Sequence, residues 1–143
     1  MHREYPSRPV ASARAAVLRG ERVLLVLRAD EPSKGLWSLP GGVIELGETT
    51  SQSVQRELAE ECAVAIEVGP LLRVEDNIVR DDSGRIRFHY VVTCVLARHV
   101  AGRARAGSDA ASVRWATRQE LGALDMHAIA RCVALEALDT AGG

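Results

Sequence analysis

The sequence predicts an α/β fold in which one mixed β-sheet lies between helices. Short apolar runs rich in β-branched residues occur on both sides of a single capped helical segment in the middle of the chain. A second amphipathic segment lies near the C-terminus. Strands that are interrupted by one helix and followed by another are typical of a sheet covered by helices on its faces.

Length and composition indicate one ordinary globular domain. The chain has 143 residues, 47% of them hydrophobic and 26% charged. We expect a single domain over residues 1–143, with an N-terminal arm over 1–12. The formal net charge is −1, which excludes a protein drawn as a whole to nucleic acid or to an anionic membrane. No apolar run approaches the roughly 20 residues of a membrane helix, and the N-terminus does not resemble a signal peptide. We therefore expect a cytoplasmic protein.

The three cysteines predict no metal site. Cys62, Cys94 and Cys132 are far apart, no CxxC pair occurs, and each lies in an apolar run. This pattern argues against a zinc site or a disulfide framework. We expect all three to be small buried residues.

The first third of the chain predicts a hairpin followed by a loop. Two apolar runs, 13–18 and 23–27, flank the Arg-Gly-Glu turn at 19–21, which is typical of a β-hairpin. Residues 29–42 contain two prolines and three glycines, and they are expected to form a loop.

The helix in the middle of the chain has a clear start signal. Thr49 and Gln52 fit a capping box, so a helix should start near Thr50 and end near Cys62. The rest of the chain predicts alternating strands and turns and a final helix. The expected elements are a β-leaning segment at 66–80, a turn at 81–84, a long strand at 86–100, a loop at 101–110, a short strand at 113–116, a helical turn at 118–123 and an amphipathic helix at 127–138.

Glutamates gather on one side of the central helix. At about 100° per residue, Glu57, Glu60 and Glu61 share an arc of about 100°, directly beside the apolar stripe of the helix. That stripe consists of Val54, Leu58 and Cys62. One interpretation is a solvated acidic face. However, residues 49–65 contain no lysine, and acids at the border of a core repel one another and lose solvation. A divalent cation such as Mg²⁺, which prefers oxygen ligands, would remove that cost.

The spacing around this helix resembles the Nudix box of MutT-like Nudix hydrolases. Gly42, five residues, Glu48, seven residues and then 56–61 (RELAEE) fit the pattern G-x5-E-x7-R-E-U-x-E-E-x-G-U, where U is a bulky aliphatic residue. Val64 fits the last position, and the preceding WSLPGG run resembles the usual approach to the box. Ala63 departs from the pattern, which expects glycine after the helix. Either the helix ends differently here, or Ala63 takes a left-handed conformation.

The resemblance implies a Nudix fold, an α/β/α sandwich with a mixed central sheet. It also implies hydrolysis, with Mg²⁺ or Mn²⁺, of a nucleoside diphosphate linked to another group. By position in the box, Glu57, Glu60 and Glu61 resemble the metal-binding glutamates. Gly42 would add its backbone carbonyl to the metal set, and Glu48 a supporting carboxylate. The catalytic set implied in this way is Arg56, Glu57 and Glu60, with Arg56 orienting a glutamate through an ion pair.

The general base and the substrate contacts are less closely defined. Glu57 or Glu60 is favoured as the base, and Asp109 is an alternative from a later loop, although it also fits an ordinary turn residue. Arg28, at a strand end, is a candidate phosphate contact. Phe88 is a candidate wall for a base, and it shares a strand face with Tyr90, although that face also fits a core.

The implied partner is a small-molecule nucleoside diphosphate derivative. No basic stripe or basic amphipathic helix suggests a nucleic acid or a membrane as partner. The resemblance leaves monomer or homodimer open, since many family members are dimers. An alternative function is a non-catalytic Nudix-fold module that binds a nucleotide or ADP-ribose. No proline lies about 15 residues beyond the box, where ADP-ribose pyrophosphatases often have one, and this lowers the expectation for that substrate.

Overall fold

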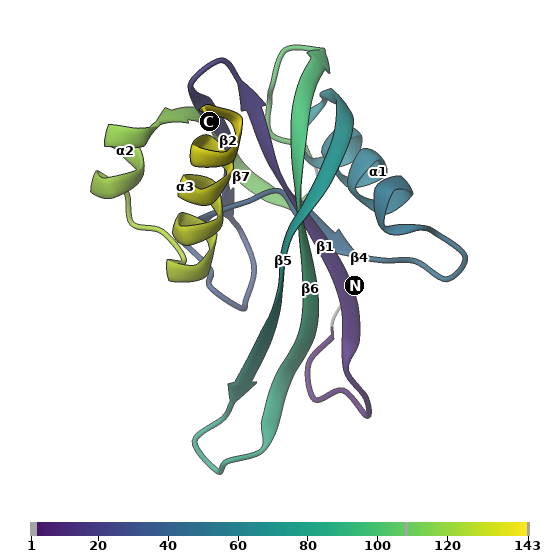
Figure 1. Ribbon diagram of the computed structural model, residues 1–143. Coiled ribbons are helices and arrows are strands. Elements are labelled where there is room, and N and C mark those ends of the chain that lie inside the picture. Colours follow the sequence, from purple (N-terminus) through teal and green to yellow (C-terminus); the bar gives the residue numbers. More distant parts are fainter. Residues whose placement is uncertain (1–2, 108, 143) are drawn as a thin grey trace.

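A computed structural model describes residues 3–107 and 109–142 of the chain. Figure 1 labels the helices and every strand except β3. The elements are β1 (Val10–Arg19), β2 (Arg22–Arg28), β3 (Trp37–Ser38), β4 (Gly41–Val43), α1 (Thr50–Cys62), β5 (Ala65–Arg80), β6 (Ile86–Ala101), β7 (Ala110–Thr117), α2 (Arg118–Ala123) and α3 (Ala128–Gly142).

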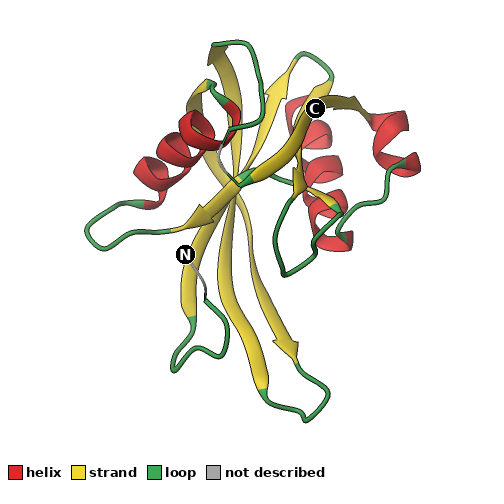
Figure 2. Cartoon of the chain, turned by 180° about the vertical axis from the view of Figure 1, so that it is seen from behind, coloured by secondary structure: helices red, strands yellow, loops and turns green. Residues whose placement is uncertain are grey.

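The strands form one mixed sheet between helices. The main path is β3-β2-β1-β6-β5, with β4 pairing with β1 and β7 with β2. β1 and β6 are parallel, and the other strand pairs are antiparallel. Helix α1 lies on one side of the sheet, and α2 and α3 lie on the other (Figures 1 and 2). The predicted α/β/α arrangement with a mixed sheet is therefore confirmed.

Each face of the sheet has its own hydrophobic core. On one face, the apolar stripe of α1 packs on β1, β2 and β6. All three residues of that stripe, Val54, Leu58 and Cys62, are fully buried, as the helical spacing predicts. On the other face, α3 packs Val133, Ala134 and other small residues against the sheet. Helices therefore pack on both faces of the sheet, and this packing fixes the position of α1 relative to β1, β2 and β6.

The N-terminal hairpin is confirmed, but two predicted boundaries are wrong. β1 and β2 pair antiparallel around Gly20, whose φ of 59° suits glycine. However, β1 begins at Val10, inside the predicted arm over 1–12. The predicted loop at 29–42 also contains β3 and begins β4, because Gly41–Val43 pairs with the first half of β1. Glycine and proline content predicts a loop there, and it gives no signal for this long-range pairing.

Helix α1 begins and ends with well-defined caps. The Gln52 N–H donates to Thr49 Oγ1 at 3.1 Å, and the Thr49 N–H donates to Gln52 Oε1 at 2.9 Å, so the predicted capping box is present. At the other end, Ala63 has φ 61° and ψ 30°, and its N–H donates to the Ala59 carbonyl at 3.1 Å. The helix therefore ends through a left-handed residue, as it would with glycine, although that residue is alanine.

The C-terminal half follows the prediction with small shifts. β7 begins at Ala110, inside the predicted loop, and α3 is longer than expected. Cys62 and Cys94 are buried as predicted, but Cys132 is exposed on α3, so the prediction for this residue is wrong. An apolar neighbourhood in sequence does not decide which face of a helix a residue occupies. Among the described residues, no helix is long and apolar enough to cross a membrane.

Candidate functional site

A cavity of about 480 Å³ lies between α1 and the strands beside it. Its walls come from segments far apart in the sequence. On one side are Gly41, Gly42, Val43, Glu57, Glu60 and Glu61, and on the other are Arg3, Ser12, Arg14, Arg28, Asn77, Tyr90 and Val92. The cavity therefore has an acidic side, formed by α1 and β4, and a basic side, formed mainly by β1, β2, β5 and β6.

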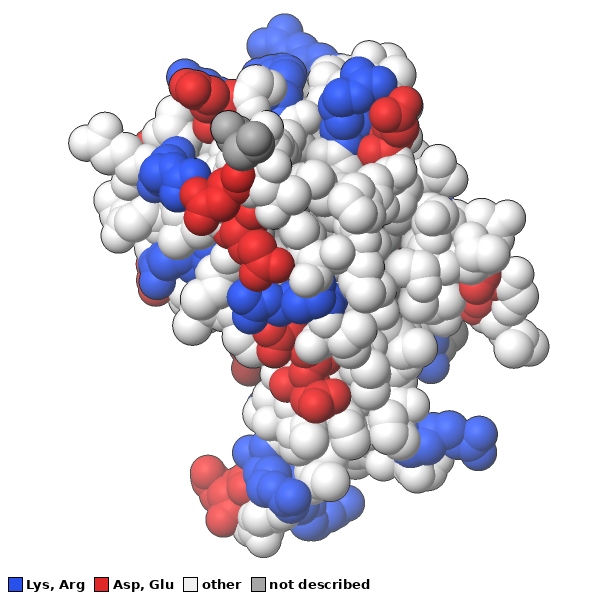
Figure 3. All heavy atoms as spheres, in the orientation of Figure 1, with Lys and Arg blue, Asp and Glu red and all other residues white. Residues whose placement is uncertain are grey.

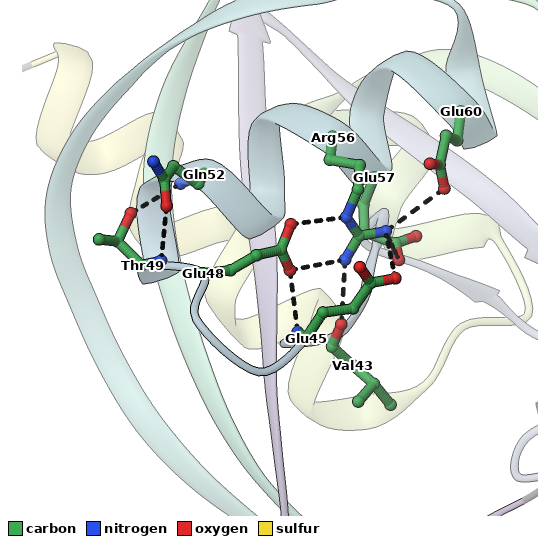
Figure 4. A network of polar contacts seen from close by, with 8 residues as sticks. All are labelled: Val43, Glu45, Glu48, Thr49, Gln52, Arg56, Glu57 and Glu60. Atoms are coloured by element: carbon green, nitrogen blue, oxygen red, sulfur yellow. Dashed lines mark hydrogen bonds and ion pairs between the residues drawn. The ribbon is translucent and has the colours of Figure 1, made fainter.

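Arg56 holds the acidic side together (Figure 4). Its Nε and Nη2 donate to the two carboxylate oxygens of Glu48 at 2.7 and 2.9 Å. Its Nη1 donates to Glu57 at 2.8 Å and to Glu60 at 3.3 Å. Its Nη2 also donates to the Val43 carbonyl at 3.2 Å. Its Nη1 also lies 3.7 Å from a Glu45 oxygen, so one guanidinium contacts four carboxylates and reduces the repulsion between glutamates one turn apart on α1.

Glu48 supports the network and does not line the cavity. Both of its oxygens accept from Arg56, and one also accepts the Glu45 N–H at 2.8 Å. These hydrogen bonds lower the pKa of Glu48 to about 2. Glu48 therefore stays ionised and fixes Arg56, and through Arg56 it fixes the position of the other glutamates.

Glu61 is the most buried of the glutamates on α1. Its side chain is 8% exposed, and one oxygen accepts the Gly41 N–H at 3.1 Å. Burial raises the pKa of Glu61 to about 7, although the hydrogen bond from Gly41 and the nearby Arg14 act in the opposite direction. The geometry agrees with the predicted position of this acid at the border of the core.

Gly42 lies in direct contact with Glu57. A Cβ added to Gly42 would lie 2.7 Å from the carboxyl carbon of Glu57, so no larger residue fits without moving that carboxylate. The absence of a side chain therefore allows the backbone of β4 to lie against a glutamate of α1.

The donor chemistry of this side suits a hard divalent cation. Three carboxylates and a backbone carbonyl are oxygen ligands of the kind that Mg²⁺ and Mn²⁺ take. In the described part of the chain, no three acidic, histidine or cysteine side chains lie close enough to hold one metal ion as they stand. Glu57 and Glu60 instead point to Arg56. Side-chain rotation of Glu57 or Glu60 would be needed before they converge with Glu61.

The loop after β6 closes over the C-terminal end of α1. The Gly107 N–H donates to the Glu61 carbonyl at 2.8 Å, and the Arg105 N–H donates to the Cys62 carbonyl at 3.0 Å. A Cβ on Gly107 would lie 2.0 Å from the Glu60 carbonyl oxygen, so glycine is needed for this contact. Asp109, the alternative general base, follows with φ 65° and lines the cavity. A base must lie at the cavity, and the position of Asp109 meets this condition. Its neighbour Ser108 lies outside the described residues.

The two remaining candidates have different surroundings. Arg28 lines the cavity, and its Nε donates to the Pro32 carbonyl at 2.6 Å. Burial lowers the pKa of Arg28, and the positive charge of Arg14 lowers it further by a smaller effect. Phe88 is 2% exposed and does not line this cavity. Tyr90, whose ring stacks on Phe88 with centroids 6.2 Å apart, lines the cavity in its place.

Sequence reasoning missed several residues of the basic side. Ser12, Arg14 and Asn77 line the cavity from β1 and β5, and none is part of the box. One signal was present for Arg14, because it is a charged residue inside the apolar run 13–18. The others carry no local signal, since only the pairing of distant strands brings them to the cavity.

Comparison with known proteins gives one consistent match. The NUDIX domain profile matches residues 8–136. The chain is 34% identical over 139 residues to a MutT-like protein of Streptomyces ambofaciens, covering 96% of this chain and 81% of that protein. It is 32% identical over 102 residues to an ADP-ribose pyrophosphatase of Methanocaldococcus jannaschii, covering 71% of this chain and 58% of that protein.

Two crystal structures have the same fold. The MutT NUDIX hydrolase from Burkholderia pseudomallei superposes with a TM-score of 0.76 at 27% identity, covering 91% of this chain and 98% of that one. The NUDIX domain of Shewanella oneidensis NrtR, crystallised with ADP-ribose, superposes with a TM-score of 0.74 at 26% identity, covering 94% and 90%.

Proposed function

The chain belongs to the Nudix family of hydrolases, which act on phosphoric anhydride bonds with divalent metal ions, and we propose that it is a Mg²⁺-dependent pyrophosphohydrolase. Its substrate would be a nucleoside diphosphate linked to another group. The products would be a nucleoside monophosphate and a second phosphorylated compound. Mn²⁺ would serve in place of Mg²⁺, because both take oxygen ligands.

The observation that carries this proposal is the complete acidic side of the cavity. Glu57, Glu60 and Glu61 would hold the metal ion, and the Gly42 carbonyl would complete the protein ligands. Arg56 keeps the network in place through Glu48. A bound divalent ion would neutralise the diphosphate and lower the pKa of a water molecule beside it.

The protein residues then have separate roles in hydrolysis. Water adds to one phosphorus atom, the P–O bond of the anhydride breaks, and the leaving phosphoryl oxygen keeps the bonding electrons. Glu57 or Glu60 takes the proton lost by the water. Asp109 lines the same cavity from the opposite loop and is the alternative base. Arg28 would contact a phosphate oxygen from the sheet side.

A small soluble substrate agrees with the surface of the protein. On the face seen in Figure 3, basic and acidic side chains are interspersed, and no continuous basic band crosses it. A nucleic-acid backbone would require such a band. The relatives named above include an ADP-ribose pyrophosphatase, and ADP-ribose is therefore one member of the test set.

A hydrolysis panel tests the proposal. Deoxynucleoside triphosphates, ADP-ribose, dinucleoside polyphosphates and nucleotide sugars would be incubated with Mg²⁺, with Mn²⁺ or with excess EDTA. We expect at least one substrate to yield a nucleoside monophosphate with metal and none to react in EDTA. Tight binding of a nucleotide with no turnover of any substrate would instead establish the non-catalytic binding module.

A further inference from the structure

Two arginines on the sheet side of the cavity lack carboxylate partners. Arg14 Nη1 donates to the Leu39 carbonyl at 2.8 Å, and Arg28 Nε donates to the Pro32 carbonyl at 2.6 Å. In the described ranges, neither guanidinium has a carboxylate within 4.0 Å. Six other arginines form ion pairs with carboxylates, namely Arg56, Arg73, Arg87, Arg98, Arg114 and Arg118. The lack of an ion pair therefore sets Arg14 and Arg28 apart from this group.

The position of Arg14 and Arg28 makes their lack of a carboxylate partner destabilising in the ligand-free protein. Both side chains are half-buried, both line the cavity, and the charge of Arg14 acts unfavourably on Arg28. Two like charges held together in a partly desolvated place destabilise the protein unless something of opposite charge joins them. Each guanidinium uses one of its five N–H donors in a resolved hydrogen bond and has others left for a ligand.

Further unsatisfied polar atoms surround these arginines. Ser12 is 3% exposed and lines the cavity, and its buried Oγ has no hydrogen-bond partner. It lies two residues before Arg14 on β1, so both side chains are on the same face of the strand. The Nε atom of Arg3, another lining residue, is likewise buried without a partner. The polar atoms of this wall are thus arranged to receive a ligand with oxygen acceptors.

The nearby carboxylates do not neutralise this wall. Asp30 and Glu31 also line the cavity. Glu31 accepts the Lys34 N–H at 3.1 Å and lies 3.9 Å from Arg87. Glu61, across the cavity, acts favourably on both Arg14 and Arg28, and Asp30 acts favourably on Arg28. Within the described residues, neither carboxylate lies within 4.0 Å of these guanidiniums, so hydrogen-bond donors of both remain open to a ligand.

We propose that Arg14, together with Arg28, binds a phosphoryl group of the substrate that lies outside the diphosphate held at the carboxylates of α1. A guanidinium matches phosphate oxygens in a bidentate way, and a phosphoryl group brings the missing negative charge. Arg14 therefore sets a preference for substrates with a third phosphoryl group. The inference rests on the proposed function only in placing the diphosphate on the acidic side.

Kinetics of Arg14→Gln provide the first test. For a nucleoside triphosphate, we expect kcat/KM to fall by about tenfold to a hundredfold, on the scale of one lost hydrogen bond to a charged group. The loss should be mainly in KM. For ADP-ribose, which has two phosphoryl groups, kcat/KM should change by less than about threefold. Arg98→Gln, which removes an exposed arginine on β6, should alter neither value. Equal losses for both substrates would show that Arg14 supports the site generally, and the proposal would be wrong.

Binding without catalysis provides the second test. In EDTA, calorimetry should show tripolyphosphate binding to the wild-type chain and at least about tenfold weaker binding to Arg14→Gln, with Arg14→Lys between them. Arg28→Gln should weaken binding as well, and it covers the case in which Arg14→Gln does not fold. Equal affinity of the wild type and a folded variant would overturn the subsite. If no substrate were hydrolysed but this binding depended on Arg14, the proposed enzyme function would fail and the subsite would stand.

Discussion

The two sides of the cavity are built in opposite ways. On the acidic side, Arg56 contacts four carboxylates, and the buried Glu61 accepts a backbone N–H from Gly41. On the basic side, the guanidiniums of Arg14 and Arg28 have backbone carbonyls as their resolved partners. The carboxylates of the acidic side already have hydrogen-bond donors as partners before any ligand arrives. Among the described residues, Arg14 and Arg28 have no carboxylate within 4.0 Å.

This difference suggests that the acidic side positions the catalytic groups and that the basic side attracts the charge of the substrate. The Arg56 network orders the carboxylates of α1 in the free protein, and Glu57 or Glu60 rotates out of it to reach a metal ion together with Glu61. Substrate charge, in contrast, is recognised best by donors that have no competing partner. We therefore expect changes on the acidic side to act mainly on kcat and on metal binding, and changes on the basic side to act mainly on KM.

The largest effect should come from Glu57→Gln. This change keeps the size of the side chain but removes a charge that the metal ion requires, so kcat should fall by about a hundredfold or more. Removing a like charge from α1 should leave thermal stability unchanged or slightly higher. Steady-state kinetics and thermal melts of both proteins measure this, with Glu67→Gln, an exposed glutamate on β5, as control. Full activity of Glu57→Gln would remove Glu57 from the proposed machinery.

Arg56→Lys should separate charge from geometry on the acidic side. Lysine keeps the positive charge but cannot bridge Glu48, Glu57 and Glu60 with a planar fork. We expect kcat to fall by about tenfold, and denaturant unfolding to show a loss of about 1–3 kcal/mol. An unchanged free energy of unfolding would mean that the Arg56 network does not stabilise the folded protein.

The stability of the metal-free protein should depend on pH through Glu61. The pKa of Glu61 is about 7 in the folded chain, against an ordinary value of 4.5. The folded state therefore binds more protons between these values, and the contribution of Glu61 to stability is lost as the pH rises from about 4.5 through about 7. Chemical unfolding in EDTA across this range should show the decline, and Glu61→Gln should flatten it. A wild-type profile identical to that of the variant would contradict the burial of this charge.

The smallest effect should come from Ala63→Gly, at the end of α1. The left-handed φ of 61° costs alanine about 1 kcal/mol, and glycine adopts it freely, although glycine also loses more entropy on folding. The free energy of unfolding should rise by at most about 1 kcal/mol, and activity should stay within a few-fold. A large gain in activity would show that alanine displaces the carboxylates of the box.

Local patterns predicted the acidic side well and the basic side poorly. The spacing from Gly42 to Glu61 lies within one turn and one helix, where period and caps determine which side chains share a face. The same reasoning anticipated the buried stripe of α1 and the position of Glu61. Arg14, Ser12 and Asn77 come together only through the parallel pairing of β1 with β6 and the antiparallel pairing of β5 with β6. Strand pairing over such distances leaves little trace in a single sequence, which is also why β3 and β4 were assigned to a loop.

The central claim is that cations bind on the acidic side and phosphoryl groups on the basic side. Paired binding measurements on Glu57→Gln and Arg14→Gln test it most directly, with Mn²⁺ binding followed by water proton relaxation and tripolyphosphate binding followed by calorimetry in EDTA. We predict that Glu57→Gln loses most Mn²⁺ affinity and keeps tripolyphosphate affinity, and that Arg14→Gln does the reverse. Loss of both affinities in each folded variant would contradict the separation and show that the cavity binds its ligands as one undivided site.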